Sequence, residues 1–325
     1  MFKNPTKGRV FFRLQFTIDI QHRILEITQL IKQLIVQQVR EIVNSGKPPT
    51  DFLYPPGDPG LFGPDSIVWR VHGDFISMMI GGISSLVLQA LHPSALAGVW
   101  DHSTFRDDLK GRLGRTAYFI AATTYGNTQM ATQAIMRVKK IHAALKGTLP
   151  NGKKYEVSDP HLLYWVHLTE AYSFLNAHRI YVDSNISLSD QNQYFYEIST
   201  ISKELGCQIL DANGVDCFAI TKEDSENAIY SYLPELEFSD RAKWVVELLE
   251  NFPSKPNTYF LNKLIIKAGF YNLPDWAYQV MGRQKPNDLE RKLLNQSILL
   301  MAKPVRWALS NGVHAHAKRR MGIFN

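Results

Sequence analysis

The chain has 325 residues, of which 45% are hydrophobic and 20% are charged, and its formal net charge is +6. This composition excludes a disordered or collagen-like chain and allows a large buried core. Cys207 and Cys217 form neither a CxxC pair nor a disulfide framework, which favours a reducing compartment. Residues 1–13 are not followed by the apolar region of a secretory signal, so we expect a cytoplasmic protein.

Basic residues are concentrated in two parts of the chain. Residues 103–154 contain ten basic and two acidic side chains, and the last 25 residues contain five basic and none acidic. The C-terminal group has neither interleaved aromatic residues nor a nucleic-acid-binding motif, so no nucleic-acid partner is expected. We interpret it as a solvated tail, and peripheral contact with an anionic membrane stays open.

The N-terminal part is predicted to contain two helices separated by a loop. Apolar residues at helical spacing predict an amphipathic helix over 16–44, and a Pro/Gly-rich loop over 54–60 completes an N-terminal segment, 1–60. Asp65 or Ser66 is expected to begin one long apolar helix that ends at His92-Pro93. Its most apolar part, 75–91, is shorter than the ~20 residues of a membrane span, and we expect it to be a central buried helix.

The middle of the chain is predicted to form three further helices and a small ribbon. A turn-rich piece over 98–103 precedes a helix that ends at Gly126, and Asn127 caps a second helix that ends at Gly147. The turn signal Pro150-Asn151-Gly152 predicts a small β-ribbon within 148–157.

Asp159-Pro160 begins a helix expected to reach about His178. Amphipathic segments then continue, and we find no internal repeat or linker in the sequence. The pattern predicts an all-α fold: a single large multi-helix domain over 61–325 around the central helix. The later helices are expected at 193–205, 241–251, 258–268 and 288–302.

Two of these helices place polar groups beside apolar ones. Arg112, Arg115 and Thr116 share one helix face, because they lie three or four residues apart. On the next helix His142 falls within an apolar stripe, from which Lys139 points away. An imidazole there can bind a metal through one nitrogen and form a hydrogen bond through the other. The alternative is a core histidine bonded to a carbonyl or a tyrosine. The stripe consists of Ile135, Val138, Ile141 and Leu145.

A second candidate site lies on the helix that begins at Asp159. His167 and Glu170 are three residues apart, a spacing that two metal ligands can use. A two-metal helical bundle would need a second such pair, which the sequence lacks. An ordinary contact between neighbouring side chains is therefore the alternative. Dinucleotide, Walker, HExxH and GxSxG motifs are absent from the sequence.

Several segments together resemble the rubber-oxygenase (latex-clearing protein) and mpaB-type oxygenase catalytic domain family. The resemblance covers about 65–175 well and the C-terminal region loosely. The segments are Trp69-Arg70, the apolar helix ending at Leu91-His92-Pro93, and residues 98–103, 111–116, 138–147 and 159–167.

Members of that family are α-helical proteins that bind haem b, and those studied cleave isoprenoid double bonds with O₂. The resemblance implies that His142, with His167 as the alternative, binds the iron. It implies cofactor contacts for Arg112, Lys139 and Lys146, and catalytic roles near the haem for Arg112, Arg115 and Thr116. The expected partners are O₂ and an apolar, isoprenoid-like substrate.

One departure from the family concerns Arg115, which stands where rubber oxygenases carry a lysine that can occupy the distal iron position. A guanidinium is a poor metal ligand, so an open or water-bound distal site follows. No match is found for the acidic residue proposed as the base in rubber cleavage. Five apolar residues are candidates for a substrate channel, with a core role as the alternative: Phe75, Met78, Met79, Phe119 and Ile120.

Two other functions stay open on the sequence. One is a non-catalytic haem protein of the same fold that senses, carries or handles peroxide. The other is a helical protein with a non-haem metal at His167 and Glu170, or with no cofactor.

Overall fold

The computed structural model describes residues 23, 26–37, 39, 50–207, 209–210, 213–214 and 217–324. Over these residues the regular secondary structure is helical apart from one two-stranded ribbon, so the all-α prediction is confirmed. The helix predicted over 16–44 is present at each described position between 23 and 39. Its other positions, and residues 1–13, lie outside the described part.

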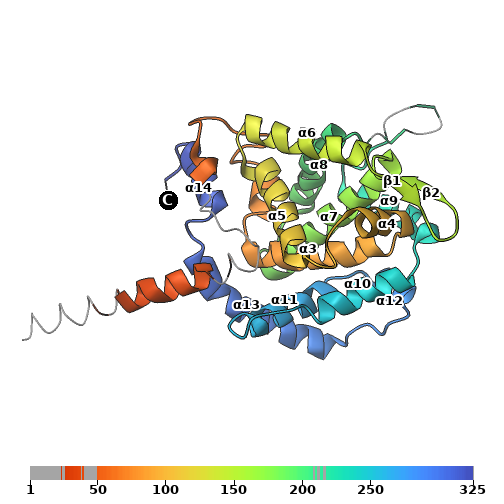
Figure 1. Cartoon of the computed structure of the whole chain (residues 1–325). Helices are drawn as coiled ribbons and strands as arrows, with labels where there is room; N and C mark the ends of the chain where they lie inside the picture. Colours follow the sequence, from red (N-terminus) through yellow and green to blue (C-terminus); the bar gives the residue numbers. More distant parts are fainter. Residues whose placement is uncertain are drawn as a thin grey trace, which may run out of the picture.

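The helices form three layers, with α3 (Phe75–Ala90) and α7 (Pro160–Tyr181) through the centre (Figure 1). The layer on one side contains α5 (Leu109–Tyr125), α6 (Thr128–Ala143) and α8 (Leu188–Leu205). The layer on the other side contains α10 (Asp240–Glu250), α11 (Tyr259–Tyr271), α12 (Asp275–Met281) and α13 (Asp288–Ala308).

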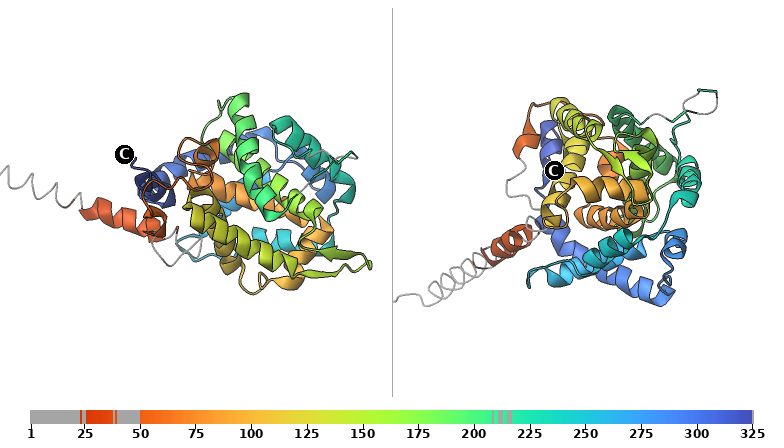
Figure 2. Two further views of the ribbon diagram at one scale, coloured as in Figure 1. Left: turned by 90° about the horizontal axis from the view of Figure 1, so that it is seen from above. Right: turned by 45° about the vertical axis from the view of Figure 1, so that its right-hand side comes forward.

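Shorter elements close the two ends of this arrangement. They are η1 (Thr50–Leu53), α2 (Ile67–Val71), α4 (Pro93–His102), β1 (Lys146–Thr148), β2 (Lys154–Glu156), α9 (Lys222–Ser231), η2 (Leu233–Glu235) and α14 (Val313–Arg320). The helix between 23 and 39 extends outward near the end of α13, and the ribbon lies at the opposite end of the molecule (Figure 2).

The predicted long helix between residues 65 and 91 is two helices. Ser66 caps α2, where its side chain accepts a hydrogen bond from the Trp69 amide. Asp74 caps α3, where its carboxylate accepts a bond from the Ser77 amide at 2.9 Å. Each cap satisfies a helix-end amide locally, so the chain turns at His72-Gly73 between them. The predicted stop at His92-Pro93 is confirmed, because α3 ends at Ala90.

Two other boundaries differ from the predictions. Residues 98–103, predicted as turns, are helical up to His102 because Pro93 begins α4. The helix that carries His142 ends at Ala143, before Gly147, which pairs with Tyr155 in the predicted ribbon. A Cβ at Gly147 would lie 2.6 Å from the Tyr155 hydroxyl oxygen, so the glycine is required by packing in the ribbon. It does not end a helix.

The basic C-terminus is not the solvated tail predicted from its charge. The Arg320 side chain is buried, and its guanidinium donates to three backbone carbonyl oxygens, those of Phe52, Asp58 and Gly126. These bonds attach α14 to η1 and to the turn between α5 and α6. A buried cation is retained where its donors are satisfied, so this arginine is a structural residue.

Within the described residues no single helix is long and apolar enough to cross a membrane. The pair α3 and α4 passes by length and composition only when joined, and its two helices are bent by 104°.

The central helix α3 approaches its neighbours at two glycines. A Cβ built at Gly81 would lie 2.9 Å from the Ser173 carbonyl oxygen of α7. On the opposite side, a Cβ at Gly269 of α11 would lie 2.5 Å from the Ile83 side chain. Both distances are shorter than van der Waals contact, so these two helix pairs can pack at their observed separation only because the side chains are absent.

Replacing Gly81 by Ala should therefore destabilise the protein, whereas replacing Gly82 should not. Gly81→Ala forces α3 and α7 apart and should cost about 1–3 kcal/mol. A Cβ at Gly82 meets nothing within 4 Å, so Gly82→Ala should gain about 0.5–1 kcal/mol from helix propensity. Urea denaturation of both variants measures the difference, and equal stabilities would contradict the close approach.

Candidate functional site

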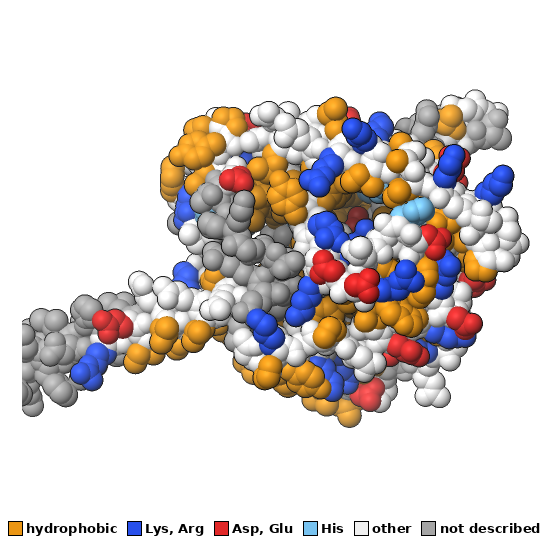
Figure 3. Space-filling model, in the orientation of Figure 1, with side chains coloured by type: hydrophobic (Ala, Val, Ile, Leu, Met, Phe, Trp, Pro, Cys, Tyr) orange, Lys and Arg blue, Asp and Glu red, His pale blue; other side chains and the backbone are white. Residues whose placement is uncertain are grey.

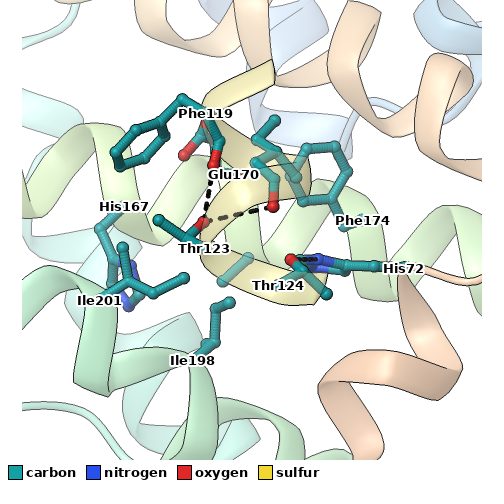
Figure 4. A pocket seen from close by; sticks show the side chains of 11 residues that line it. His72, Phe119, Thr123, Thr124, His167, Glu170, Phe174, Ile198 and Ile201 are labelled. Atoms are coloured by element: carbon teal, nitrogen blue, oxygen red, sulfur yellow. Dashed lines mark hydrogen bonds between the residues drawn. The ribbon is translucent and has the colours of Figure 1, made fainter. Parts of the chain in front are cut away.

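An internal pocket lies between α5, α7 and α8, with His72 at its far end (Figure 4). The space between its side chains, together with the solvent at its open mouth, amounts to about 350 Å³. On the outside, Figure 3 shows a hollow in the face beside α5 and α6, with basic side chains on its rim. The pocket is lined by His72, Phe119, Ile120, Thr123, Thr124, His167, Glu170, Ala171, Phe174, Ile198 and Ile201.

The threonine hydroxyls of the α5 wall have hydrogen-bond partners within α5 and at His72. The Thr123 hydroxyl donates to the Phe119 carbonyl oxygen at 2.9 Å. Thr124 forms a hydrogen bond with His72 Nδ1, and the other ring nitrogen bonds to the Tyr194 hydroxyl at 3.0 Å. Burial lowers the pKa of His72 to about 3, so this imidazole is neutral and fully bonded. It therefore holds α2, α5 and α8 together, with no nitrogen left for a metal.

His167 and Glu170 lie on the same face of α7 and both line the pocket, as their spacing predicted (Figure 4). Burial lowers the pKa of His167 to about 3, so its ring is neutral. Burial also raises the pKa of Glu170 to about 7, against the opposing charge of Arg112. Near neutral pH this carboxyl is therefore both a proton donor and a proton acceptor, which is the range of a general acid–base group.

Arg112 contributes a positive charge beside Glu170 without forming a salt bridge to it. Within the described residues its guanidinium forms no hydrogen bond or ion pair. Burial, followed by repulsion from Arg115, lowers the pKa of Arg112, and attraction to Glu170 opposes this shift. The charge of Arg112 also acts on His142. Arg112 thus lies within electrostatic range of both a histidine and a carboxyl group.

His142 is half-buried on α6, and it is not one of the residues that line the pocket. Its Nδ1 is buried and has no hydrogen-bond partner among the described residues. Burial and the Arg112 charge both lower its pKa, which favours the neutral ring that a metal binds. The predicted apolar stripe around it is only partly correct, because Ile135 is buried but Ile141 is 48% exposed.

Arg115 and Thr116 lie apart from the pocket lining. The Arg115 side chain is 59% exposed and lies 3.7 Å from the Asp108 carboxylate. The Thr116 hydroxyl donates to the Arg112 carbonyl oxygen at 3.3 Å. Arg112 and Arg115 share a predicted face, but in the structure Arg112 is half-buried and Arg115 is exposed. Their roles near a haem stay predictions.

The two predicted cofactor-binding lysines are on the surface. Lys139 donates to the Glu204 carbonyl oxygen at the end of α8, at 3.3 Å. Lys146 is exposed on β1. Of the five predicted channel residues, Phe119 and Ile120 line the pocket. The other three, Phe75, Met78 and Met79, pack against the hydrophobic core.

The sequence interpretation missed His72 and the whole contribution of α8. His72 follows a short helix that was predicted to continue, so nothing marked it as the end of an element. Ile198 and Ile201 have the three-residue spacing of any buried helix face. The proton-exchanging character of Glu170 was missed as well, because a raised pKa depends on burial that a sequence does not display.

The pocket places the Glu170 carboxyl and the His167 imidazole on an otherwise largely apolar lining, a combination that occurs in enzyme sites. Comparison with family models identifies the class: residues 69–307 match the family described as ER-bound oxygenase mpaB/B'/Rubber oxygenase, catalytic domain. The chain belongs to this family. The match extends well beyond 65–175, so helices α8 to α13 are part of the same oxygenase-type domain. Curated proteins and solved structures gave no match.

The raised pKa of Glu170 predicts a specific dependence of stability on pH. Because the folded-state pKa is about 7 and the ordinary value is 4.5, folding favours the protonated carboxyl. Its stability contribution is complete below pH 4.5 and is lost as the pH rises through 7. Glu170→Gln is neutral at every pH. As the pH rises from 5 to 8, its free energy of unfolding should therefore increase by about 1–3 kcal/mol relative to that of the wild type, since one pKa unit is about 1.4 kcal/mol.

Urea denaturation at a series of pH values measures this difference. Glu156→Gln is the matched control, because Glu156 is exposed on β2. Parallel pH profiles of the wild type and Glu170→Gln would show that the surroundings of the carboxyl do not raise its pKa.

Proposed function

We propose that this protein is an O₂-dependent oxygenase that uses haem b and acts on an apolar, isoprenoid-like substrate. The observation that carries the proposal is a pair of polar groups without partners in one region: the buried Nδ1 of His142 and the guanidinium of Arg112. Family membership supports the oxygenase activity. The haem and the substrate class are the further steps.

These residues fit a haem because the group would supply what they lack. A buried imidazole nitrogen without a partner costs about 1–3 kcal/mol, and a partly buried cation needs an anion. A haem offers an iron for the imidazole and two carboxylates for the guanidinium. His142 would hold the iron, with His167 as the alternative, and Arg112 would bind a propionate. Lys139 and Lys146 are surface groups, so at most they would contact the solvent-facing edge of the haem.

A bound haem would supply the binding and activation of O₂. The other functions follow from the side chains of the chain itself. Glu170 exchanges a proton at a carboxylate oxygen, since its pKa of about 7 leaves both forms populated. The positive charge of Arg112 favours the ionised form of that carboxyl and opposes the rise in its pKa that burial causes. Phe119, Ile198 and Ile201 exclude water and provide the apolar surface that a hydrocarbon substrate needs.

Two alternative functions each differ from the proposed oxygenase in one feature of the site. A non-catalytic haem protein would use the same His142 and Arg112 but would not need the acid–base group Glu170. A non-haem metal at His167 and Glu170 would need further ligands. Among the residues that the structure describes, the one group of three metal-binding side chains lies elsewhere, which disfavours this alternative.

Peripheral membrane contact is part of the proposal because of one exposed surface. Apolar side chains on the helix between 23 and 39 are about half exposed and lie at helical spacings of three and four: Ile27, Leu30, Ile31 and Leu34. A helix with such a stripe is suited to lie in a membrane interface.

The ligand assignment predicts different spectra for two histidine variants. The wild type supplied with haem should show a Soret band, and His142→Ala should lose or shift it because the iron ligand is removed. His167→Ala should keep the band position, and His102→Ala, at an exposed position, controls for nonspecific binding. The opposite result would move the ligand to His167. No Soret band in the wild type would exclude haem.

The catalytic assignment is tested by turnover of the haem-loaded protein. Incubation with isoprenoids of increasing length under ¹⁸O₂ should yield carbonyl products that contain the label, detected by mass spectrometry. Glu170→Gln should lower kcat by about 10²- to 10⁴-fold, the usual contribution of a general acid–base group, with the Soret band unchanged. Labelled products at an undiminished rate would remove Glu170 from the mechanism. No products from any isoprenoid would favour the non-catalytic alternative.

A further inference from the structure

A second cluster of metal-binding side chains lies outside the pocket, where three elements meet. His92 precedes α4, His161 is in the first turn of α7, and Glu235 ends η2. One ligand atom from each of these residues lies within 4.8 Å of the others. We propose that these three residues bind one divalent first-row transition-metal ion, with Zn²⁺ as the ion to test.

The His92 side chain is the strongest sign of a ligand here. It is only 2% exposed, and its buried Nε2 has no hydrogen-bond partner in the described structure. The Glu235 Oε2 atom faces this nitrogen at 3.4 Å, and the ring packs beside Trp165 and Tyr232. A buried imidazole nitrogen without a hydrogen bond, 3.4 Å from a carboxylate oxygen, has the separation that two ligands of one tetrahedral metal ion have.

The other two ligands, His161 and Glu235, are positioned by a ring stack and by a hydrogen bond to each other. The His161 ring is stacked on Tyr232 with centroids 4.3 Å apart, and the Tyr232 hydroxyl donates to the His161 carbonyl oxygen at 2.8 Å. His161 Nε2 lies 2.7 Å from Glu235 Oε1. Glu235 therefore joins the two histidines, because one of its carboxylate oxygens faces each imidazole ring.

Binding requires only small shifts of these atoms. Metal–ligand bonds of about 2.1 Å in a tetrahedral site place ligand atoms about 3.4 Å apart. His161 and Glu235 must therefore separate slightly, and both are partly exposed. A metal at His92 Nε2 requires the ring proton at Nδ1, where it displaces a long 3.4 Å contact from the Ala95 amide. The first turn of α4 keeps the Leu96 amide bonded to the His92 carbonyl oxygen at 2.9 Å.

The ligand set indicates which ions fit. Two imidazoles and one carboxylate suit Zn²⁺ and its first-row neighbours, whereas Mg²⁺ and Ca²⁺ prefer oxygen ligands. A metal here would connect the starts of α4 and α7 to the η2 turn, so it would stabilise this end of the molecule. The site uses no residue of the haem proposal and stands or falls independently of it.

Calorimetric titration of metal-free protein with ZnCl₂ tests the proposal. The wild type should bind one Zn²⁺ per chain, and Glu235→Gln and His161→Asn should each weaken binding by about 100-fold or more, since even a supporting partner of a ligand contributes 10- to 100-fold. Glu237→Gln is the matched control, because Glu237 is exposed two residues from Glu235 and should leave binding unchanged. Wild-type protein should also melt at a higher temperature with Zn²⁺, and His161→Asn should not.

Three results would overturn the proposal: no Zn²⁺ binding by the wild type, equal binding by Glu235→Gln, or an equal loss in Glu237→Gln. Both test positions are partly exposed, so circular dichroism of the variants should match that of the wild type and exclude misfolding as the cause of lost binding.

Discussion

The close packing of α3 against α7 and α11 is the constraint on which the rest of the structure depends. Gly81 and Gly269 let the helices approach, and a small polar network fixes their register. The Ser84 hydroxyl donates to the Gly269 carbonyl oxygen at 2.7 Å and accepts a bond from the Asn272 side-chain amide at 2.9 Å. The same Asn272 amide also bonds to the Ser173 carbonyl oxygen on α7. Because these polar groups are buried and satisfied, any sliding of the three helices would leave several of them without partners.

That constraint positions α7, which carries residues of both the pocket and the proposed metal site. His161 lies in its first turn, and His167 follows six residues later, about 9 Å along the axis at 1.5 Å per residue. The apolar and aromatic residues between them, Trp165 above all, are buried. The two sites therefore share a rigid element, and each is completed by side chains from different neighbours: α4 and η2 at one end, α5 and α8 at the other.

Much of the fold was predictable because its signals are local. Asn127 and Asp159 cap helices where their side chains predicted, and the 75–91 run is the central helix. The errors have a common cause, since Gly147 and Arg320 are explained by contacts with Tyr155 and with distant carbonyl oxygens. The pocket residues were also predictable only in part. Their spacing placed His167 and Glu170 on one helix face, but only the fold brings His72 to them from the end of a different helix. His92, His161 and Glu235 are spread over more than 140 residues, so no sequence pattern could join them.

The charge balance around Glu170 is the feature that most strongly indicates a ligand. If Arg112 formed a salt bridge with this carboxyl, the pKa of Glu170 would lie below its ordinary value. Burial instead raises that pKa to about 7, so the carboxyl is protonated for part of the time and does not neutralise the guanidinium. A positive charge is therefore left over on Arg112, beside a neutral His142 whose buried nitrogen lacks a bond. A ligand that carries a negative charge for the Arg112 guanidinium and a binding position for the His142 imidazole would satisfy both residues. An apolar substrate alone could not do this.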